Sequence, residues 1–233
     1  MTKDTIFISE IYLCFQGEGR FCGQRIALVR TSGCNLRCKW GENYCDTPFT
    51  SWNREGVDKT INEVVEKVKL LGVNAVVISG GEPYLQPKLP ELVRAFADKR
   101  YHITIETNGT IYKPTQANFL SISPKLKSST PTGTVFETMH EEKRQTYENT
   151  AKLIEKQDYQ LKFVITSQND LNEVLAFQQK LNVPNDKIWL MPEGICKSDL
   201  ERTAIPTAEL ALQHGFNYSD RVHIRMYGNQ RGV

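Results

Sequence analysis

Three cysteines within one short stretch are the residues of this chain best suited to chemistry. Cys34, Cys38 and Cys45 lie in the segment CNLRCKWGENYC, whose polar composition is unlike that of a protein core. Three thiols in one loop can surround a single metal centre. An iron–sulfur cluster on three thiolates keeps one iron free for an external molecule. A structural zinc site needs a fourth protein ligand, and no Cys or His follows at the expected spacing. The spacing favours the cluster and leaves zinc as the alternative.

Small and polar residues also follow each predicted strand. These segments are Gly33-Cys34-Asn35, Ser79-Gly80-Gly81-Glu82-Pro83, Thr107-Asn108-Gly109, Ser123-Pro124-Lys125, Thr166-Ser167-Gln168 and Met191-Pro192-Glu193-Gly194. In parallel βα architectures the carboxyl ends of the strands meet at one rim, where active sites lie. Loops are polar in any case, so one such segment says little. Gly-Gly-Glu-Pro and Ser-Pro-Lys in the same ring indicate a functional site.

Alternating strands and helices must position these segments. The pattern predicts strands over 25–31, 73–79, 102–106, 119–123, 160–165, 187–191 and 221–227. It predicts helices from 60 to Gly72 behind a Thr60/Glu63 capping box, over 90–99, 137–157 and 171–181, and from Pro206 onward. Strands that alternate with helices pair in parallel. We therefore expect an α/β fold, a wound sheet or a partial (βα) barrel of about six core strands with a reduced helix complement, in one domain over 1–233.

Composition excludes several classes of protein. The chain has 233 residues, with 29 Lys and Arg against 27 Asp and Glu, and a net charge of +2. This balance argues against binding to a nucleic-acid backbone. No apolar run approaches the roughly 18 residues that span a bilayer, and the N-terminal stretch lacks the apolar core of a secretory signal. We expect a cytoplasmic protein without membrane contact, whose six cysteines are not paired in disulfides.

The three-cysteine loop, followed by Gly-Gly-Glu-Pro after the next strand, resembles the radical S-adenosylmethionine enzymes. Within them the chain is similar to the 7-carboxy-7-deazaguanine synthase family, from Ile11 to Lys125 and more loosely beyond. The matching segments are Phe15-Gln16-Gly17-Glu18-Gly19, Val29 to Leu36, Cys45-Asp46-Thr47, Ser79 to Pro83, Ile105 to Thr110 and Ser123-Pro124-Lys125. Gln-Gly-Glu-Gly together with Cys-Asp-Thr is specific to this branch. The resemblance implies the partial (βα) barrel of the radical S-adenosylmethionine type.

The spacing of the cysteines departs from the superfamily pattern, Cys-x3-Cys-x2-Cys. Here six residues separate Cys38 from Cys45, and we interpret 39–44 as containing a four-residue insertion. Tyr44 keeps the aromatic residue before the third cysteine, and Asp46-Thr47 follows Cys45 as the family pattern requires. A larger loop can still close on a cluster, because the ligands need proximity and not a fixed count.

The resemblance implies the cofactors and the reaction. Cys34, Cys38 and Cys45 would hold a [4Fe–4S] cluster whose free iron binds S-adenosylmethionine. The family converts 6-carboxy-5,6,7,8-tetrahydropterin to 7-carboxy-7-deazaguanine with loss of ammonia, a lyase step of queuosine-type 7-deazapurine biosynthesis. The radical derives from the cofactor, so no side chain is expected to act as a catalyst. The expected cofactor-binding residues are Gly81, Glu82, Ser123, Pro124 and Lys125.

Substrate binding falls to other matched positions. Arg30 corresponds to the family arginine that binds the pterin carboxylate, a bidentate task to which lysine is poorly suited. Phe15, Gln16, Gly17 and Ser79 match residues around the pterin, and Thr47 matches the Mg²⁺ ligand. Alone, Arg30 would be a surface ion pair and Thr47 an ordinary loop hydroxyl.

The resemblance also implies partners, namely a flavodoxin or ferredoxin as electron donor and a second copy of the chain in a homodimer. No direct contact with nucleic acid is expected. Two alternative functions remain at this point. One is a glycyl-radical activating enzyme of the same superfamily, against which Gln-Gly-Glu-Gly and Cys-Asp-Thr count. The other is a zinc-binding interaction domain, which would make Gly-Gly-Glu-Pro a coincidence.

Overall fold

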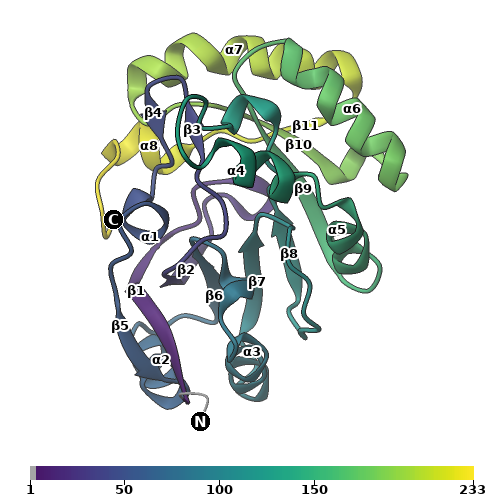
Figure 1. Cartoon of the computed structure of the whole chain (residues 1–233). Coiled ribbons are helices and arrows are strands. Elements are labelled where there is room, and N and C mark those ends of the chain that lie inside the picture. Colours follow the sequence, from purple (N-terminus) through teal and green to yellow (C-terminus); the bar gives the residue numbers. More distant parts are fainter. Residues whose placement is uncertain (1–3) are drawn as a thin grey trace.

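A computed structural model describes residues 4–233, and a curved nine-stranded sheet forms its centre. The strand order is β11-β10-β9-β8-β7-β6-β2-β1-β5 (Figure 1). The parallel strands are β2 (Arg25–Thr31), β6 (Ala75–Gly80), β7 (His102–Thr107), β8 (Phe119–Ile122), β9 (Asp158–Ile165), β10 (Ile188–Pro192) and the short β11 (Asn217–Tyr218). β1 (Thr5–Phe15) runs antiparallel to β2 and to β5 (Val57–Thr60).

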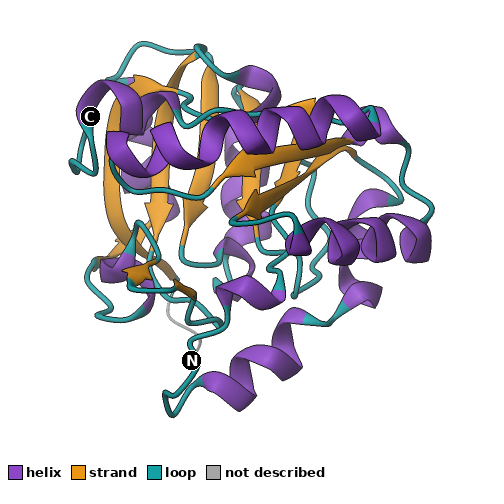
Figure 2. Ribbon diagram, turned by 90° about the horizontal axis from the view of Figure 1, so that it is seen from above, coloured by secondary structure: helices purple, strands orange, loops and turns teal. Residues whose placement is uncertain are grey.

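The longer helices lie against the outer face of this sheet (Figure 2). They are α2 (Ile61–Lys69), α3 (Leu89–Asp98), α4 (Glu137–Arg144), α5 (Tyr147–Ile154), α6 (Asn169–Leu181) and α7 (Lys197–His214). Shorter helices are α1 (Pro48–Ser51), α8 (Val222–Tyr227) and the 3₁₀ turns Gly19–Phe21, Pro83–Leu85, Lys127–Ser129 and Asn185–Lys187. Apolar side chains between sheet and helices, such as Ile78, Phe96 and Phe163, form the core. Their burial fixes the strand ends that carry the polar segments.

The predicted α/β class with a mostly parallel sheet is confirmed. The capping box is also confirmed, since the Thr60 hydroxyl accepts from the Glu63 amide while the Glu63 carboxylate accepts from the Thr60 amide. Among residues 4–233, no helix has the length and apolar character needed to span a membrane. Residues 1–3 of the N-terminal stretch, which was expected to lack a secretory signal, lie outside the described residues.

The single helix predicted over 137–157 is wrong. Two helices, α4 and α5, meet at Gln145 and Thr146. The hydroxyl of Thr146 donates to the carbonyl of Lys143, at 2.8 Å. Such a local side-chain bond competes with the helical hydrogen bonds and favours a break.

Two predictions near the C-terminus are also wrong. α7 begins at Lys197 and carries Pro206 in its interior. Its face with Leu200, Ala204 and Ala211 is buried, which compensates for the hydrogen bond that proline cannot donate. The strand predicted over 221–227 is the helix α8, because only the two residues of β11 join the sheet there. The antiparallel strand β1 was not predicted.

Candidate active site

One cavity of about 250 Å³ opens at the carboxyl ends of the parallel strands. Most residues predicted to form the site line it, namely Phe15, Gln16, Gly17, Arg30, Cys34, Cys38, Cys45, Thr47, Ser79, Gly81, Ser123 and Lys125. Glu82 and Pro124 are not among the lining residues. The polar rim expected from the strand ends therefore exists as a single cavity.

The extra residues between Cys38 and Cys45 form a β-hairpin. Its strands are β3 (Lys39–Trp40) and β4 (Asn43–Tyr44), with Lys39 opposite Tyr44. One step further, the amide of Cys45 donates to the carbonyl of Cys38 at 3.2 Å. The insertion thus projects as a closed loop and returns the third cysteine to a position across from the second. This geometry explains how the long spacing still gathers three thiols.

Aromatic side chains hold this hairpin in place. The Trp52 indole N–H donates to the carbonyl of Cys38 at 3.3 Å. Tyr44 and Phe136 pack edge-on against Trp52, with ring centroids 4.9 and 5.5 Å away. At the hairpin tip, the Asn43 amide donates to the Glu193 carboxylate in the β10 loop at 3.1 Å. The hairpin is therefore fixed at its base and its tip.

The three cysteines, hereafter the cysteine end of the cavity, fit an iron–sulfur cluster better than zinc. Sulfurs around one tetrahedral Zn²⁺ lie about 3.8 Å apart. Within residues 4–233, the one group of three Cys, His, Asp or Glu residues with ligand atoms within 4.8 Å of one another contains no cysteine. The sulfurs are spread too widely for preformed zinc. Burial raises the pKa of the Cys34 thiol to about 12, so a cationic centre is needed to hold it as a thiolate.

Two glycines allow the cysteine loop to pack against the end of β6. A Cβ atom on Gly80 would lie 2.0 Å from the Thr31 carbonyl oxygen, and one on Gly81 would lie 2.3 Å from that of Gly33. The Gly81 amide donates to Thr31 and the Glu82 amide to Gly33. Contacts with the protein's own backbone thus already require glycine at these two positions.

Glu82 is buried and accepts hydrogen bonds from residues of the neighbouring loop. Its side chain is 0% exposed and accepts from the Thr107 hydroxyl at 2.8 Å and from the amides of Asn108 and Tyr84 at 2.7 and 3.0 Å. Burial raises the pKa of Glu82 despite these donors. Both oxygens accept from these protein donors and Glu82 does not line the cavity, so its expected contact with the cofactor stays a prediction. Pro124 likewise lies off the lining, between Ser123 and Lys125.

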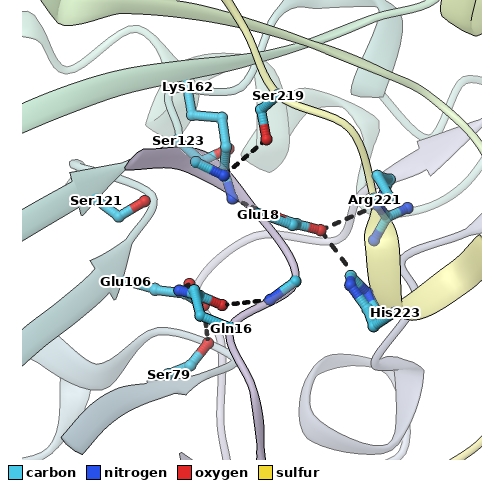
Figure 3. Close-up of polar contacts among 12 residues, drawn as sticks. Gln16, Glu18, Ser79, Glu106, Ser121, Ser123, Lys162, Ser219, Arg221 and His223 are labelled. Atoms are coloured by element: carbon cyan, nitrogen blue, oxygen red, sulfur yellow. Dashed lines mark hydrogen bonds and ion pairs between the residues drawn. The ribbon is translucent and has the colours of Figure 1, made fainter. Parts of the chain in front are cut away.

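Polar side chains from several strands meet in the cavity (Figure 3). Glu106 at the end of β7 accepts from the Gln16 amide at 2.9 Å and from the Ser79 hydroxyl at 2.7 Å. Arg30 on β2 donates to Glu10 at 2.9 Å and to the Tyr12 hydroxyl at 3.0 Å. Two of the five N–H groups of Arg30 are thus used, and the rest can serve an anionic ligand.

Four residues that we call the charged wall were not predicted as site residues from the sequence: Glu18, Lys162, Arg221 and His223. Glu18 pairs with Lys162 and lies 3.0 Å from the Arg221 guanidinium and 3.8 Å from the His223 ring (Figure 3). Burial would raise the pKa of Glu18, but Lys162 and Arg221 outweigh it and hold the pKa well below its ordinary value. Burial lowers the pKa of His223.

Arg221 ties the charged wall to the cysteine end. Its guanidinium also pairs with Asp46, the residue after Cys45, and donates to the Gly194 carbonyl at 2.5 Å. Glu18, Asp46 and His223 together have ligand atoms close enough for a metal ion. Arg221 and Lys162 together already balance the charges of the two carboxylates, so an additional cation gains little there.

Residues 28–157 match the Radical SAM superfamily, which is more than half of the chain. The crystal structure of QueE from Escherichia coli has the same fold, with a TM-score of 0.68 at 19% identity over 95% of this chain and 96% of that one. The chain is therefore a member of the radical SAM superfamily. Membership implies a [4Fe–4S] cluster and S-adenosylmethionine as cofactors.

Sequence relatives define the family within that superfamily. The 7-carboxy-7-deazaguanine synthase of Rhodopirellula baltica is 37% identical over 100% of this chain and 90% of its own length. That of Halobacterium salinarum is 34% identical over 95% of this chain and 90% of its own length. The chain belongs to the 7-carboxy-7-deazaguanine synthase family, which confirms the resemblance and the enzyme class it implied.

Proposed function

We propose that residues 1–233 act as one radical S-adenosylmethionine domain that converts 6-carboxy-5,6,7,8-tetrahydropterin to 7-carboxy-7-deazaguanine and ammonia. The observation that carries the proposal is the single cavity in which the cysteine end meets Arg30 and the Gln16–Ser79–Glu106 network. When bound, the cluster and S-adenosylmethionine supply the radical that starts the rearrangement. The protein's part is to place the substrate.

Cys34, Cys38 and Cys45 would hold the cluster. The S-adenosylmethionine would lie along Gly81 and the β8 end, where the Lys125 ammonium donates to the Ser123 hydroxyl at 2.7 Å. This bond holds the lysine ammonium at the cavity and does not use all three of its N–H donors. Glu82 holds the Thr107–Asn108 turn, and it stays in the proposal with Pro124 as a cofactor-binding residue on the family resemblance.

The substrate would bind with its carboxylate on Arg30 and its ring against the polar network. Glu106 fixes the positions of Gln16 and Ser79 by accepting from both, so their remaining polar atoms face the ring in a set geometry. The Arg30 guanidinium matches a carboxylate in shape and charge. Phe15 and Gly17 complete this side of the cavity.

Thr47 would contribute one oxygen to a Mg²⁺ ion that also binds substrate and water. Its hydroxyl lies 3.5 Å from the Cys45 sulfur and lines the cavity. Thr47→Ala should raise the Mg²⁺ concentration needed for half-maximal activity. Thr47→Ser keeps the hydroxyl and should not, and equal behaviour of the two variants would exclude the assignment.

An electron donor of the flavodoxin or ferredoxin type and a homodimer complete the proposal, both on family resemblance. Size measurement by analytical ultracentrifugation checks the dimer, and reduction of the cluster by each purified donor checks the partner. Neither the glycyl-radical activating enzyme nor the zinc-binding domain is favoured by a feature of the site.

The direct test is anaerobic turnover. The iron- and sulfide-reconstituted protein is mixed with S-adenosylmethionine, Mg²⁺, a reductant and the pterin, and products are followed by mass spectrometry. We expect 7-carboxy-7-deazaguanine from the wild type and none from Arg30→Ala or Cys45→Ala. Formation of 5′-deoxyadenosine without that product would leave the cofactor chemistry intact and exclude the substrate.

A further inference from the structure

An irregularity in β1 places an acid against Arg30. The pairing of β1 with β2 shifts between Ile8, which lies opposite Thr31, and Glu10, which lies opposite Arg30. Such a bulge redirects the side chains that follow it. The Oε2 atom of Glu10 accepts from Nε of Arg30 at 2.9 Å. An unaided Arg30–Glu10 pair is electrically neutral and would attract an anionic substrate only weakly.

A second arginine restores the charge. Nε of Arg231, near the C-terminus, donates to the other Glu10 oxygen at 2.9 Å. Its guanidinium lies 3.6 Å over the Phe49 ring and also pairs with Glu55 at 2.9 Å. Arg231, Glu10, Phe49 and Arg30 all line the cavity. Figure 1 shows the C-terminus beside α1, which carries Phe49.

The charges of this group add up in favour of an anion. Arg30, Glu10 and Arg231 together carry one net positive charge. Glu55, 56% exposed, pairs with Arg231, 48% exposed, so water screens both of these charges more than those of Arg30 and Glu10, which are each 15% exposed. The two oxygens of Glu10 are each occupied by one guanidinium, so Glu10 cannot turn away from either without losing an ion pair.

We propose that Arg231 is a positioning residue for the substrate carboxylate. It neutralises Glu10 and holds it in place, so that Arg30 keeps a fixed orientation and an excess positive charge. This inference rests on the proposed function, because it takes the ligand of Arg30 to be a pterin carboxylate. Arg231 acts through Glu10 and does not itself contact the reacting atoms. The interaction with Phe49 adds a planar contact that lysine could not reproduce.

The test measures binding to the cluster-loaded protein without a reductant. Equilibrium dialysis with fluorescent pterin-6-carboxylate and with pterin, which lacks the carboxylate, gives two dissociation constants for each variant. Arg231→Ala should weaken pterin-6-carboxylate about tenfold and leave pterin unchanged. The dissociation constant of Arg231→Lys for pterin-6-carboxylate should lie between those of the wild type and Arg231→Ala. In the double variant Glu10→Gln/Arg231→Ala, the change in binding free energy should differ from the sum of the two single changes, because both residues act on Arg30 through the same ion pair. Under turnover, Arg231→Ala should raise KM with kcat unchanged.

Arg225→Ala is the matched control, since Arg225 is an ion-paired arginine of the same terminal region whose partner is Asp220. It should change neither constant. Equal weakening of both ligands by Arg231→Ala, or weakening of neither, overturns the role of Arg231 while the proposed function stands. A wild type that binds the two ligands equally overturns both the inference and the substrate on which it rests.

Discussion

The cysteine end and the charged wall differ in how the chain builds them. The cysteine end comes from one loop and is shaped by backbone contacts, such as the Cys38–Cys45 bond of the hairpin and the close approach of Gly81 to Gly33. The charged wall joins residues far apart in the chain, such as Glu18 and Arg221, which are 203 positions apart. Local sequence therefore determines the first region, and only the folded sheet brings the second together.

This difference predicts two kinds of damage. At the cysteine end, a change should abolish or loosen the metal centre with a modest effect on the rest of the fold. In the charged wall, removal of one charge leaves its partners buried and unpaired, so the free energy of unfolding should fall strongly. Iron content and the free energy of unfolding of single variants therefore separate the two regions.

The largest expected effect is the loss of the cluster in Cys45→Ala. Removal of one of three thiolates should reduce bound iron and sulfide to near background and abolish formation of 5′-deoxyadenosine. Elemental analysis and the visible absorption of the cluster measure this. Cys196→Ala is the control, because Cys196 precedes α7 and is absent from the cavity lining. Retention of a full cluster in Cys45→Ala would show that another residue is the third ligand.

Arg221→Ala should lower the free energy of unfolding by about 3–5 kcal/mol, measured by urea denaturation under anaerobic conditions. The side chain is 8% exposed and pairs with Glu18 and Asp46, so that Asp46 would lose its ion-pair partner and Glu18 would keep only Lys162. The control is Arg202→Ala. Arg202 is 71% exposed and pairs with Asp199, and its loss should cost less than about 1 kcal/mol. Similar losses in the two variants would contradict the view that the charged wall depends on buried pairing.

Gly81→Ala tests the backbone contact at the cysteine end. The added methyl would lie 2.3 Å from the Gly33 carbonyl oxygen, so the cysteine loop must shift. We expect a loss of about 1–3 kcal/mol and a lower iron content after reconstitution. Gly133→Ala is the control for a glycine replaced without a steric contact, since its φ is +75° but the space around it is open, and it should keep full iron content. Full iron content in Gly81→Ala would show that the loop can yield without cost to the cluster.

The sequence predicted the cysteine end because each of its signals is local. Cys34, Cys38 and Cys45 lie in one stretch, and Gly81, which packs against it, lies in a Gly-Gly-Glu-Pro segment at the end of the β-branched run that forms β6. Glu18 was quoted only as part of a motif, and 221–227 was predicted as a strand with no site residue in it. The alternation in that segment imitates a strand, whereas the sheet has already ended at β11 and the segment forms α8.

Glu82 and Arg231 show two further limits of sequence reading. The Gly-Gly-Glu-Pro motif placed Glu82 at the site, but the sequence did not indicate the long-range donors from Thr107 and Asn108 that hold its carboxylate. No sequence pattern indicated a role for Arg231, since its partner Glu10 lies 221 positions away on a strand that was not predicted. Long-range ion pairs leave no periodic signal in one sequence.

The smallest effect concerns pH and His223. Burial holds the pKa of His223 below its ordinary value of 6.5, so the unfolded chain takes up a proton more readily than the folded one. Stability should therefore fall as pH drops below about 6.5, and His223→Gln should remove part of this fall. The difference should be less than about 1 kcal/mol, because the side chain is 33% exposed and partly screened. Melting temperatures between pH 7.5 and 5.5 measure it, with His214→Gln at the end of α7 as the control. If His223→Gln leaves the pH dependence of the melting temperature unchanged, Glu18 compensates fully for the burial of the imidazole. The stability contributed by the charged wall would then not depend on pH in this range, contrary to the prediction.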